Sequence, residues 1–183
     1  MKIAITGGIG SGKSYVCRVF EHYGISIYDC DSAAKRLMRT SPVLQQQLSE
    51  LIGPDTYDAE GHLNKAKVAQ FLLLSEKNAQ AIDAIVHPAV AQDFLQSGYQ
   101  WMECAILFES GFDHLVDQVI AVTAPEELRL ERVMKRDGIT HEKAKEWMHR
   151  QWSQDLVIEK SQFVIINDGR PLEPQIESII KSL

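Results

Sequence analysis

The sequence predicts an α/β protein built around a parallel sheet of five strands. Short apolar segments alternate with amphipathic segments of helical spacing along most of the 183 residues. The first apolar segment runs directly into a glycine-rich loop and then a helix, an arrangement typical of parallel sheets that bind ligands beyond the carboxyl ends of their strands. No internal repeat, low-complexity tract or linker divides the chain.

The first half of the chain is predicted to contain two strands followed by a long run of helices. The expected elements are a strand at residues 2–6, a helix at about 12–23, a strand at 25–29, and helices at 32–39, 42–53 and about 65–98. We expect a helix boundary before Pro88, because a proline inside a helix removes a hydrogen bond and clashes with the preceding turn.

The second half returns to alternating strands and helices. The expected elements are strands at about 101–108, 118–122 and 163–167, and helices at about 126–135, 140–152 and 174–183. Pro125 with two acidic residues behind it favours a helix start, and Gly138 marks a break. An all-helical insertion is therefore expected between the second and third strands.

The glycine-rich loop is the most specific motif in the chain. Residues 7–14 read Gly-Gly-Ile-Gly-Ser-Gly-Lys-Ser and fit the P-loop pattern G-x-x-x-x-G-K-[ST]. In that motif successive backbone N–H groups surround a phosphate, Lys13 reaches the β- and γ-phosphates, and the Ser14 hydroxyl ligates Mg²⁺. A plain glycine turn is the alternative, but all eight positions and both flanks fit the motif, so a bound nucleoside triphosphate is predicted.

Composition excludes some partners and compartments. The formal net charge of −6 leaves no broad basic surface for nucleic acid. Cys17, Cys30 and Cys104 are odd in number and lack zinc-ligand spacing, which indicates reduced thiols. With no apolar run long enough to span a bilayer and no signal peptide, we expect a cytoplasmic protein without a membrane partner.

Acidic residues follow two of the predicted strands. Asp29 and Asp31 end the second strand, which commonly neighbours the first in such sheets, and Glu109 ends the third. Asp31 is the candidate general base for an acceptor hydroxyl, although it is equally well placed to cap the helix that follows. Asp29 is expected to have a structural role, and Glu109 is either a ligand-orienting group or a satisfied charge at the edge of the sheet.

Three arginines on one predicted helix are candidates for contacts with phosphate. Arg129, Arg132 and Arg136 recur at spacings of three and four, which places them along one face. Arginines near a transferring phosphoryl group stabilise its charge, but a solvated face paired with nearby glutamates is the alternative. Arg136, beside the expected turn, is the strongest of the three candidates. His87 is either a structural residue at a helix boundary or a group facing a ligand phosphate.

Taken together, these motifs resemble bacterial dephospho-coenzyme A kinases over nearly the whole chain. The motifs that carry the resemblance are Ile5–Ser14, Asp29-Cys30-Asp31 with Ala33 and Ala34, His87-Pro88, Ile106-Leu107-Phe108-Glu109, residues 117–122, Arg132, Arg136-Asp137-Gly138, Gln151 and Asn167. The chain departs from the usual pattern at Arg129 and Trp147, where the family commonly has glutamine and arginine, and these departures fall in the expected lid.

The resemblance implies transfer of the ATP γ-phosphate to the ribose 3′-hydroxyl of dephospho-coenzyme A, with Mg²⁺ as cofactor. It implies that ATP phosphates are held by Gly10, Ser11, Gly12, Lys13, Ser14 and Tyr15. Asp31 would be the base, Lys13 and Arg136 would stabilise the transferring group, and Ser14 would bind the metal. Asp31, His87 and Glu109 would lie on the side of the acceptor substrate. A monomer is expected.

The same resemblance implies a P-loop three-layer fold with two additions to its core. The core would comprise residues 1–40, 99–128 and 153–183, with a helical substrate-binding insertion at about 41–98 and a helical lid at about 129–152. Two other functions remain open from the residues themselves. One is a kinase of the same fold that acts on another small molecule, and the other is a switch-type P-loop ATPase.

Overall fold

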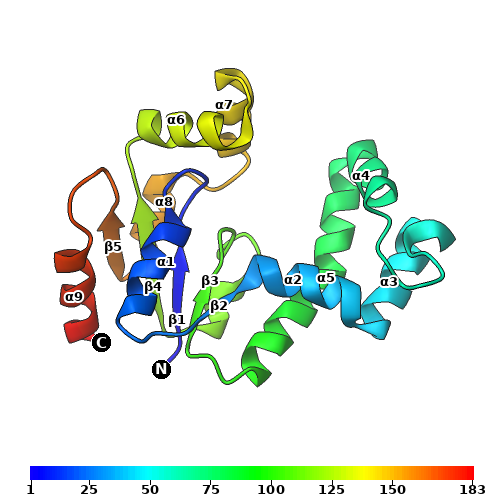
Figure 1. Ribbon diagram of the computed structural model, residues 1–183, viewed down its shortest axis with the longest axis horizontal. Helices are drawn as coiled ribbons and strands as arrows, with labels where there is room; N and C mark the ends of the chain where they lie inside the picture. The colour runs from blue at the N-terminus through cyan, green and yellow to red at the C-terminus, as the bar shows by residue number, and fades with distance from the viewer. The chain divides into compact units, whose positions relative to one another are not determined.

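A computed structural model describes residues 1–183, and the chain divides into two compact units. The first unit comprises residues 1–28 and 99–183 and contains the sheet, while the second comprises residues 29–98 and contains helices (Figure 1). No helix is long and apolar enough to cross a membrane.

Five strands form one sheet in the order β2-β3-β1-β4-β5. Their bounds are β1 Ile3–Thr6, β2 Ile27–Asp29, β3 Trp101–Glu103, β4 Gln118–Thr123 and β5 Phe163–Ile166. The pairs of β1 with β3, β1 with β4, and β4 with β5 are parallel, so the five-stranded parallel sheet is confirmed. The expectation that the second strand neighbours the first is wrong, because β3 lies between them.

The helices of the first unit differ from the predicted set mainly in one short helix. Their bounds are α1 Lys13–His22, α6 Glu126–Asp137, α7 His141–His149, α8 Gln154–Glu159 and α9 Glu173–Ser182, with a 3₁₀ turn at Phe112–Leu115. The sequence analysis missed α8, which has only six residues and too little length for helical spacing to emerge. Its start is fixed locally, because the Ser153 hydroxyl accepts a hydrogen bond from Leu156 N–H.

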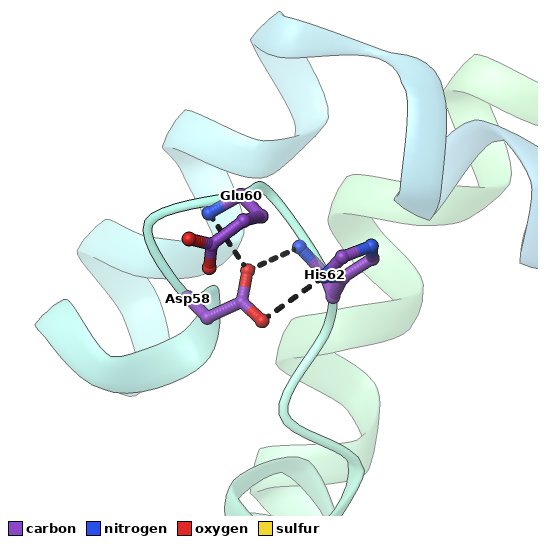
Figure 2. Close-up of side chains that lie close together, drawn as sticks. All are labelled: Asp58, Glu60 and His62. Carbon is purple, nitrogen blue, oxygen red and sulfur yellow. Dashed lines mark hydrogen bonds and ion pairs between the residues drawn. The ribbon is translucent and has the colours of Figure 1, made fainter.

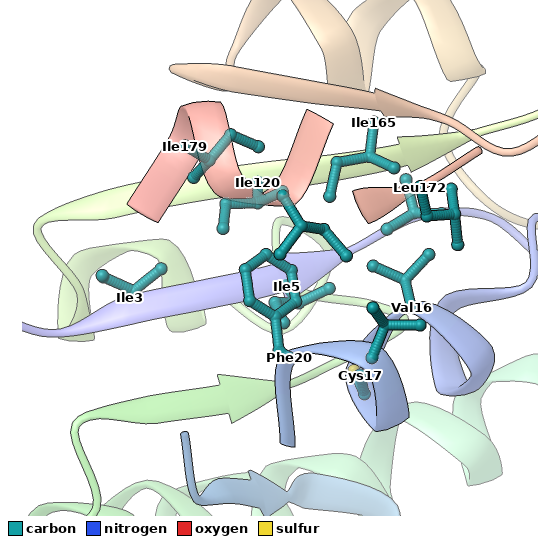
Figure 3. Packing of buried hydrophobic residues seen from close by; sticks show 12 residues of the cluster. Ile3, Ile5, Val16, Cys17, Phe20, Ile120, Ile165, Leu172 and Ile179 are labelled. Atoms are coloured by element: carbon teal, nitrogen blue, oxygen red, sulfur yellow. The ribbon is translucent and has the colours of Figure 1, made fainter. Parts of the chain in front are cut away.

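Two helices cover one face of the sheet and form the main core with it. Apolar side chains from α1 and α9 pack on alternate residues of the central strands (Figure 3). The cluster comprises Ile3, Ile5, Val16, Cys17, Val19, Phe20, Ile120, Val122, Ile165, Leu172, Ile176 and Ile179. The intervening residues of β4, Val119 and Ala121, are also buried, and α8 packs against that strand. A strand that is buried on both faces explains the continuous apolar run in its sequence.

The α6–α7 helical hairpin has a small core of its own beside the P-loop. Leu130 and Val133 of α6 pack with Ala144 and Met148 of α7, and Ile9 of the P-loop packs against this cluster. Trp147 also packs there, so this departure from the family pattern serves as a partly buried apolar residue. Figure 1 shows the hairpin at the end of the sheet where the P-loop lies.

The second unit consists of four α-helices and a 3₁₀ turn. They are α2 Cys30–Thr40, α3 Pro42–Ile52, the turn Pro54–Thr56, α4 Lys65–Leu74 and α5 Glu76–Gln96. The long α5 helix packs against the other three, and Val86, Val90 and Phe94 on it are buried.

The predicted helix boundary at Pro88 is wrong, because α5 continues through it. The break falls at Ser75 instead, whose hydroxyl caps α5 by accepting a hydrogen bond from Asn78 N–H. Packing of α5 along its length against its neighbours offsets the hydrogen bond that Pro88 cannot donate.

Candidate active site

The P-loop runs from the end of β1 to the first turn of α1, where Lys13 begins the helix. Three of its glycines, Gly7, Gly10 and Gly12, have positive φ and lie against other backbone or side-chain atoms. A Cβ atom on Gly10 would lie 2.5 Å from the Arg129 carbonyl oxygen, and one on Gly12 would lie 2.1 Å from the Asn167 side-chain nitrogen. These positions admit only glycine, both for conformation and for space.

Two arginines of α6 bind the carbonyl groups of this loop. Arg129 Nε donates to the Ile9 carbonyl oxygen at 3.0 Å, and Arg132 Nη1 donates to the Gly10 and Ser11 carbonyl oxygens at 3.2 and 3.3 Å. Because these carbonyl groups accept hydrogen bonds from α6, the loop is fixed against that helix. Arg129 is buried, and burial lowers the pKa of its guanidinium below the ordinary value. Neither arginine lies on a solvated face or pairs with a glutamate there.

Two amide side chains complete the support of the loop. Ile9 N–H donates to Gln151 Oε1 at 2.7 Å, and Asn167 Nδ2 donates to the Ser11 carbonyl oxygen at 2.9 Å. Gln151 follows α7 and Asn167 follows β5, so segments far apart in sequence meet at the loop. The sequence analysis named both residues through the resemblance but could not predict these contacts.

A cavity of about 450 Å³ lies at the P-loop. Its lining includes all six residues predicted to hold phosphates, namely Gly10, Ser11, Gly12, Lys13, Ser14 and Tyr15, together with Arg132 and Arg136. Ser11 is 1% exposed, and its buried hydroxyl has no hydrogen-bond partner. Lys13 and the first turn of α1 also lie at this cavity, so it fits a negatively charged ligand rich in hydrogen-bond acceptors.

Glu103 is the functional candidate that the sequence analysis missed. It ends β3, opposite Ile5 of β1, and its carboxylate lies 3.5 Å from Lys13 Nζ and accepts a hydrogen bond from the Ser14 hydroxyl at 3.1 Å. Its side chain is only 17% exposed. Glu103 is an acidic residue directly after two apolar strand residues. The sequence would have pointed to it if the strand had been predicted to end there.

The prediction that the third strand ends at Glu109 is wrong. β3 stops at Glu103, and the following residues turn on themselves, with Ser110 N–H donating to the Ile106 carbonyl oxygen at 2.9 Å. Glu109 accepts a hydrogen bond from Trp152 N–H at 3.0 Å, and the Trp152 ring stacks on Phe108. In this structure Glu109 therefore fixes the segment that follows α7.

Arg136 lines the cavity but points its charge at a neighbouring residue. Its guanidinium donates to the Asp137 carboxylate at 2.7 Å, and its side chain is 61% exposed. The hydrogen bond with Asp137 raises the pKa of Arg136, and the same bond lowers the pKa of Asp137. An exposed pair of this kind contributes little to stability, so exchanging Asp137 for a phosphate costs little.

Asp31 belongs to the second unit and does not cap α2. The cap is Asp29, whose carboxylate accepts hydrogen bonds from Ser32 N–H at 3.0 Å and from the Ser32 hydroxyl at 2.7 Å. Asp31 lies in the first helical turn with its side chain 78% exposed, paired with Lys35 at 2.5 Å. This pair raises the pKa of Lys35. Because Asp29 satisfies the helix end, the Asp31 carboxylate is not committed to it.

His87, the remaining predicted residue, lies in the middle of α5. Its Nε2 atom is 3.5 Å from Asp83 Oδ1, one helical turn earlier on the same helix. Its side chain is partly exposed, so it is not part of the buried face of α5.

A cluster of possible metal ligands lies in the loop between α3 and α4 (Figure 2). Atoms of Asp58, Glu60 and His62 lie within 4.8 Å of one another, and all three side chains are exposed. The Asp58 carboxylate accepts hydrogen bonds from Glu60 N–H at 3.0 Å and His62 N–H at 2.7 Å, and it pairs with the His62 ring at 3.1 Å. These bonds are those of a polar turn, and they account for the cluster without a metal.

The family model that matches this chain and the similar curated proteins share one description. A family model described as dephospho-CoA kinase matches residues 1–173. A dephospho-CoA kinase from Bacteroides fragilis is 41% identical over 191 residues, which cover 100% of this chain and 93% of that protein. The crystal structure of TT1252 from Thermus thermophilus superimposes with a TM-score of 0.84 at 27% identity, covering 100% of this chain and 97% of that one. A dephospho-CoA kinase from Campylobacter jejuni shares the fold, with a TM-score of 0.69 at 21% identity and the same coverage.

Proposed function

The chain belongs to the dephospho-CoA kinase family, and we propose that its P-loop holds the phosphates of Mg²⁺·ATP while Asp31 accepts the proton of the attacking hydroxyl. The family phosphorylates the ribose 3′-hydroxyl of dephospho-coenzyme A in the last step of coenzyme A biosynthesis. Membership in it decides against a switch-type ATPase and against a kinase for another small molecule.

The part of the proposal that concerns ATP rests on one observation, a cavity at a P-loop whose carbonyl groups are held by side chains of α6. Arg129 and Arg132 bind these carbonyl groups. The N–H groups that are left for phosphate oxygens are those of Gly10, Gly12, Lys13 and Ser14. Lys13 and Arg136 line the same cavity and supply positive charge to a phosphoryl group in transfer.

The residues around Ser14 fit a Mg²⁺ ion. The Ser14 hydroxyl and the Glu103 carboxylate are oxygen donors, the ligands that Mg²⁺ prefers, and they lie 3.1 Å apart. Ser14 would bind the ion directly, and Glu103 would bind it directly or through water. The ion would neutralise charge on the β- and γ-phosphates. Lys13, which lies 3.5 Å from Glu103, would supply its positive charge to the same phosphates.

The acceptor half of the proposal depends on Asp31. Its carboxylate is exposed, is not needed as a helix cap, and is held by Lys35. A carboxylate within hydrogen-bond reach of the 3′-hydroxyl accepts the proton as the oxygen attacks the γ-phosphate. His87 and Glu109 are proposed to contact the same substrate, as the resemblance implies.

The test is the variant Asp31→Asn, which keeps the size of the side chain and removes the base. We expect kcat to fall by about 10²- to 10⁴-fold, the usual contribution of a positioned base. The affinity for ATP is expected to stay within about twofold, because the base acts only on the acceptor. Both values come from a coupled kinase assay and from calorimetric titration of ATP.

The matched control is Asp29→Asn, because asparagine caps helices as well as aspartate does and the same charge is removed two residues away. Its kcat is expected to stay close to that of the unmodified protein. A kcat of Asp31→Asn equal to that of the control would show that Asp31 is not the base.

A further inference from the structure

Arg129 of α6 carries a buried positive charge that no carboxylate balances. The residue is only 6% exposed, and its guanidinium forms no ion pair. Glu126 is the carboxylate whose charge acts on it, and Glu126 is exposed, three positions earlier on the same helix. The guanidinium stays charged, because arginine is not deprotonated in proteins. The protein therefore keeps an unbalanced cation in its interior beside the P-loop.

The hydrogen-bond acceptors of this guanidinium are neutral. Arg129 Nε donates to the Ile9 carbonyl oxygen at 3.0 Å, and Nη1 donates to Gln154 Oε1 at 3.3 Å. The Gln154 oxygen is shared, because it also accepts a hydrogen bond from Ala124 N–H at 3.3 Å. Burying a charge costs more free energy than neutral acceptors return, unless an opposite charge comes near. The need to hold the loop by hydrogen bonds therefore does not by itself account for a cation at this position.

The guanidinium lies against the P-loop at Gly8. A Cβ atom on Gly8 would lie 2.3 Å from Arg129 Nη2 and 3.1 Å from its Cζ. The φ of Gly8 is not positive, so the missing side chain makes room for the guanidinium and does not serve an unusual backbone conformation. Gly8 and Ile9 line the cavity at the P-loop, whereas Arg129 does not. The charge of Arg129 thus acts on the cavity through the loop backbone and touches no ligand there.

Two of the cations that do line this cavity are paired with carboxylates. Lys13 Nζ lies 3.5 Å from the Glu103 carboxylate, and Arg136 is paired with Asp137 at 2.7 Å. Arg129 has no such partner, and its hydrogen bonds hold it in one place. Charges that are buried in this way are screened by salt much less than exposed ones. Arg129 is therefore a fixed source of positive potential at the space proposed for phosphates.

We propose that Arg129 determines specificity for phosphate charge, because its buried cation acts through the P-loop and favours the more negative nucleotide, ATP over ADP. The inference rests on the proposed function, since it takes the cavity at the P-loop as the ATP site. Phosphates in that cavity bring the first negative charge close to the guanidinium. Their binding therefore relieves the cost of burying the cation, and it does so more with each added negative charge.

Two variants of the full-length protein separate the charge from the hydrogen bonds. Arg129→Lys keeps the charge and a donor, whereas Arg129→Gln keeps a donor and loses the charge. Calorimetric titration gives the Kd for ATP and for ADP at one fixed Mg²⁺ concentration. Arg129→Gln is expected to raise the Kd for ATP by about tenfold or more and the Kd for ADP by less, so that the preference for ATP falls. Arg129→Lys is expected to keep that preference within about twofold. Lys77→Gln, at an exposed lysine of α5, is the control for loss of one positive charge.

The results that would overturn the inference differ in what they leave standing. If the unmodified protein binds ATP and Arg129→Gln matches Lys77→Gln in both Kd values, the charge contributes nothing while the proposed function stands. If both Arg129 variants lose affinity for ATP and ADP by one common factor, the side chain holds the loop through its hydrogen bonds alone. If either Arg129 variant fails to fold, as its melting temperature would show, the side chain serves the fold. If the unmodified protein does not bind ATP, the proposed function and this inference both fail.

Discussion

Glu103 contacts the two side chains of the P-loop that are proposed to act on a nucleotide. Its carboxylate contacts both Lys13, which is expected to bind phosphate, and Ser14, which is expected to bind the metal. A negative charge at this point holds the lysine in place before ATP binds, and afterwards it can serve the metal. One partly buried carboxylate thus contacts both the proposed phosphate-binding lysine and the proposed metal-binding serine.

Replacing this acid by its amide tests that role. Glu103→Gln is expected to lower kcat by about 10- to 100-fold and to raise the Mg²⁺ concentration needed for half-maximal rate, because an amide is a weaker ligand and carries no charge. The measurement is the rate of phosphoryl transfer as Mg²⁺ is varied at a fixed ATP concentration.

Glu21→Gln, at the far end of α1 from the P-loop, is the control for loss of one exposed negative charge outside the site. A Glu103→Gln variant that matches this control in both rate and Mg²⁺ dependence would assign Glu103 a packing role only.

Single residues differ in how well the sequence predicted them. The P-loop positions were predictable because the motif is local, and all six line the cavity. Arg129 and Arg132 were recognised as candidates, but not as supports of the loop, because their partners lie about 120 residues away. The sequence indicated Asp31 as the candidate base but did not show that Asp29 caps α2, because either residue could occupy the cap position at a helix start.

At the scale of elements, the P-loop depends on α6 as much as on α1. The α6 backbone lies against Gly10, and the side chains of Arg129 and Arg132 reach the loop's carbonyl groups. The phosphate-binding conformation is therefore set by contact between elements.

Two glycine variants separate contact from backbone conformation. Gly10 and Gly24 both have φ near +80°, but a Cβ atom on Gly10 would meet the Arg129 carbonyl oxygen at 2.5 Å while one on Gly24 meets nothing within 4 Å. Gly24→Ala is expected to cost about 1–2 kcal/mol of stability from the left-handed conformation alone, with ATP binding retained. Gly10→Ala is expected to cost more and to abolish detectable ATP binding.

Chemical denaturation and calorimetric titration of ATP check this pair of variants. Equal stability and equal ATP affinity in the two variants would show that contact with α6 does not set the shape of the loop.

The elements that the sequence predicted well are those with local signals. Helix caps and glycine stops placed most helix ends within a few residues, whereas three features depended on tertiary packing. These are the continuation of α5 through Pro88, the early end of β3, and the position of β3 between β1 and β2. Strand order in particular is not encoded in any one segment, because it depends on where the chain returns after residues 29–98.

At the scale of the whole molecule, the proposed chemistry divides between the two units. The first unit carries the P-loop, Glu103 and Arg136, and the second carries Asp31 and His87. The fold and the family could be predicted from the order of the motifs along the chain. The contacts that hold the P-loop in place could be seen only in the structure.

The most direct test of this account is a coupled assay of ATP consumption with dephospho-CoA, with adenosine and without an acceptor, followed by identification of the product. We expect turnover with dephospho-CoA to exceed the other two conditions by at least about tenfold, with the new phosphate on the ribose 3′-oxygen. Equal ATP turnover in all three conditions, or a phosphate on another atom, would contradict the account.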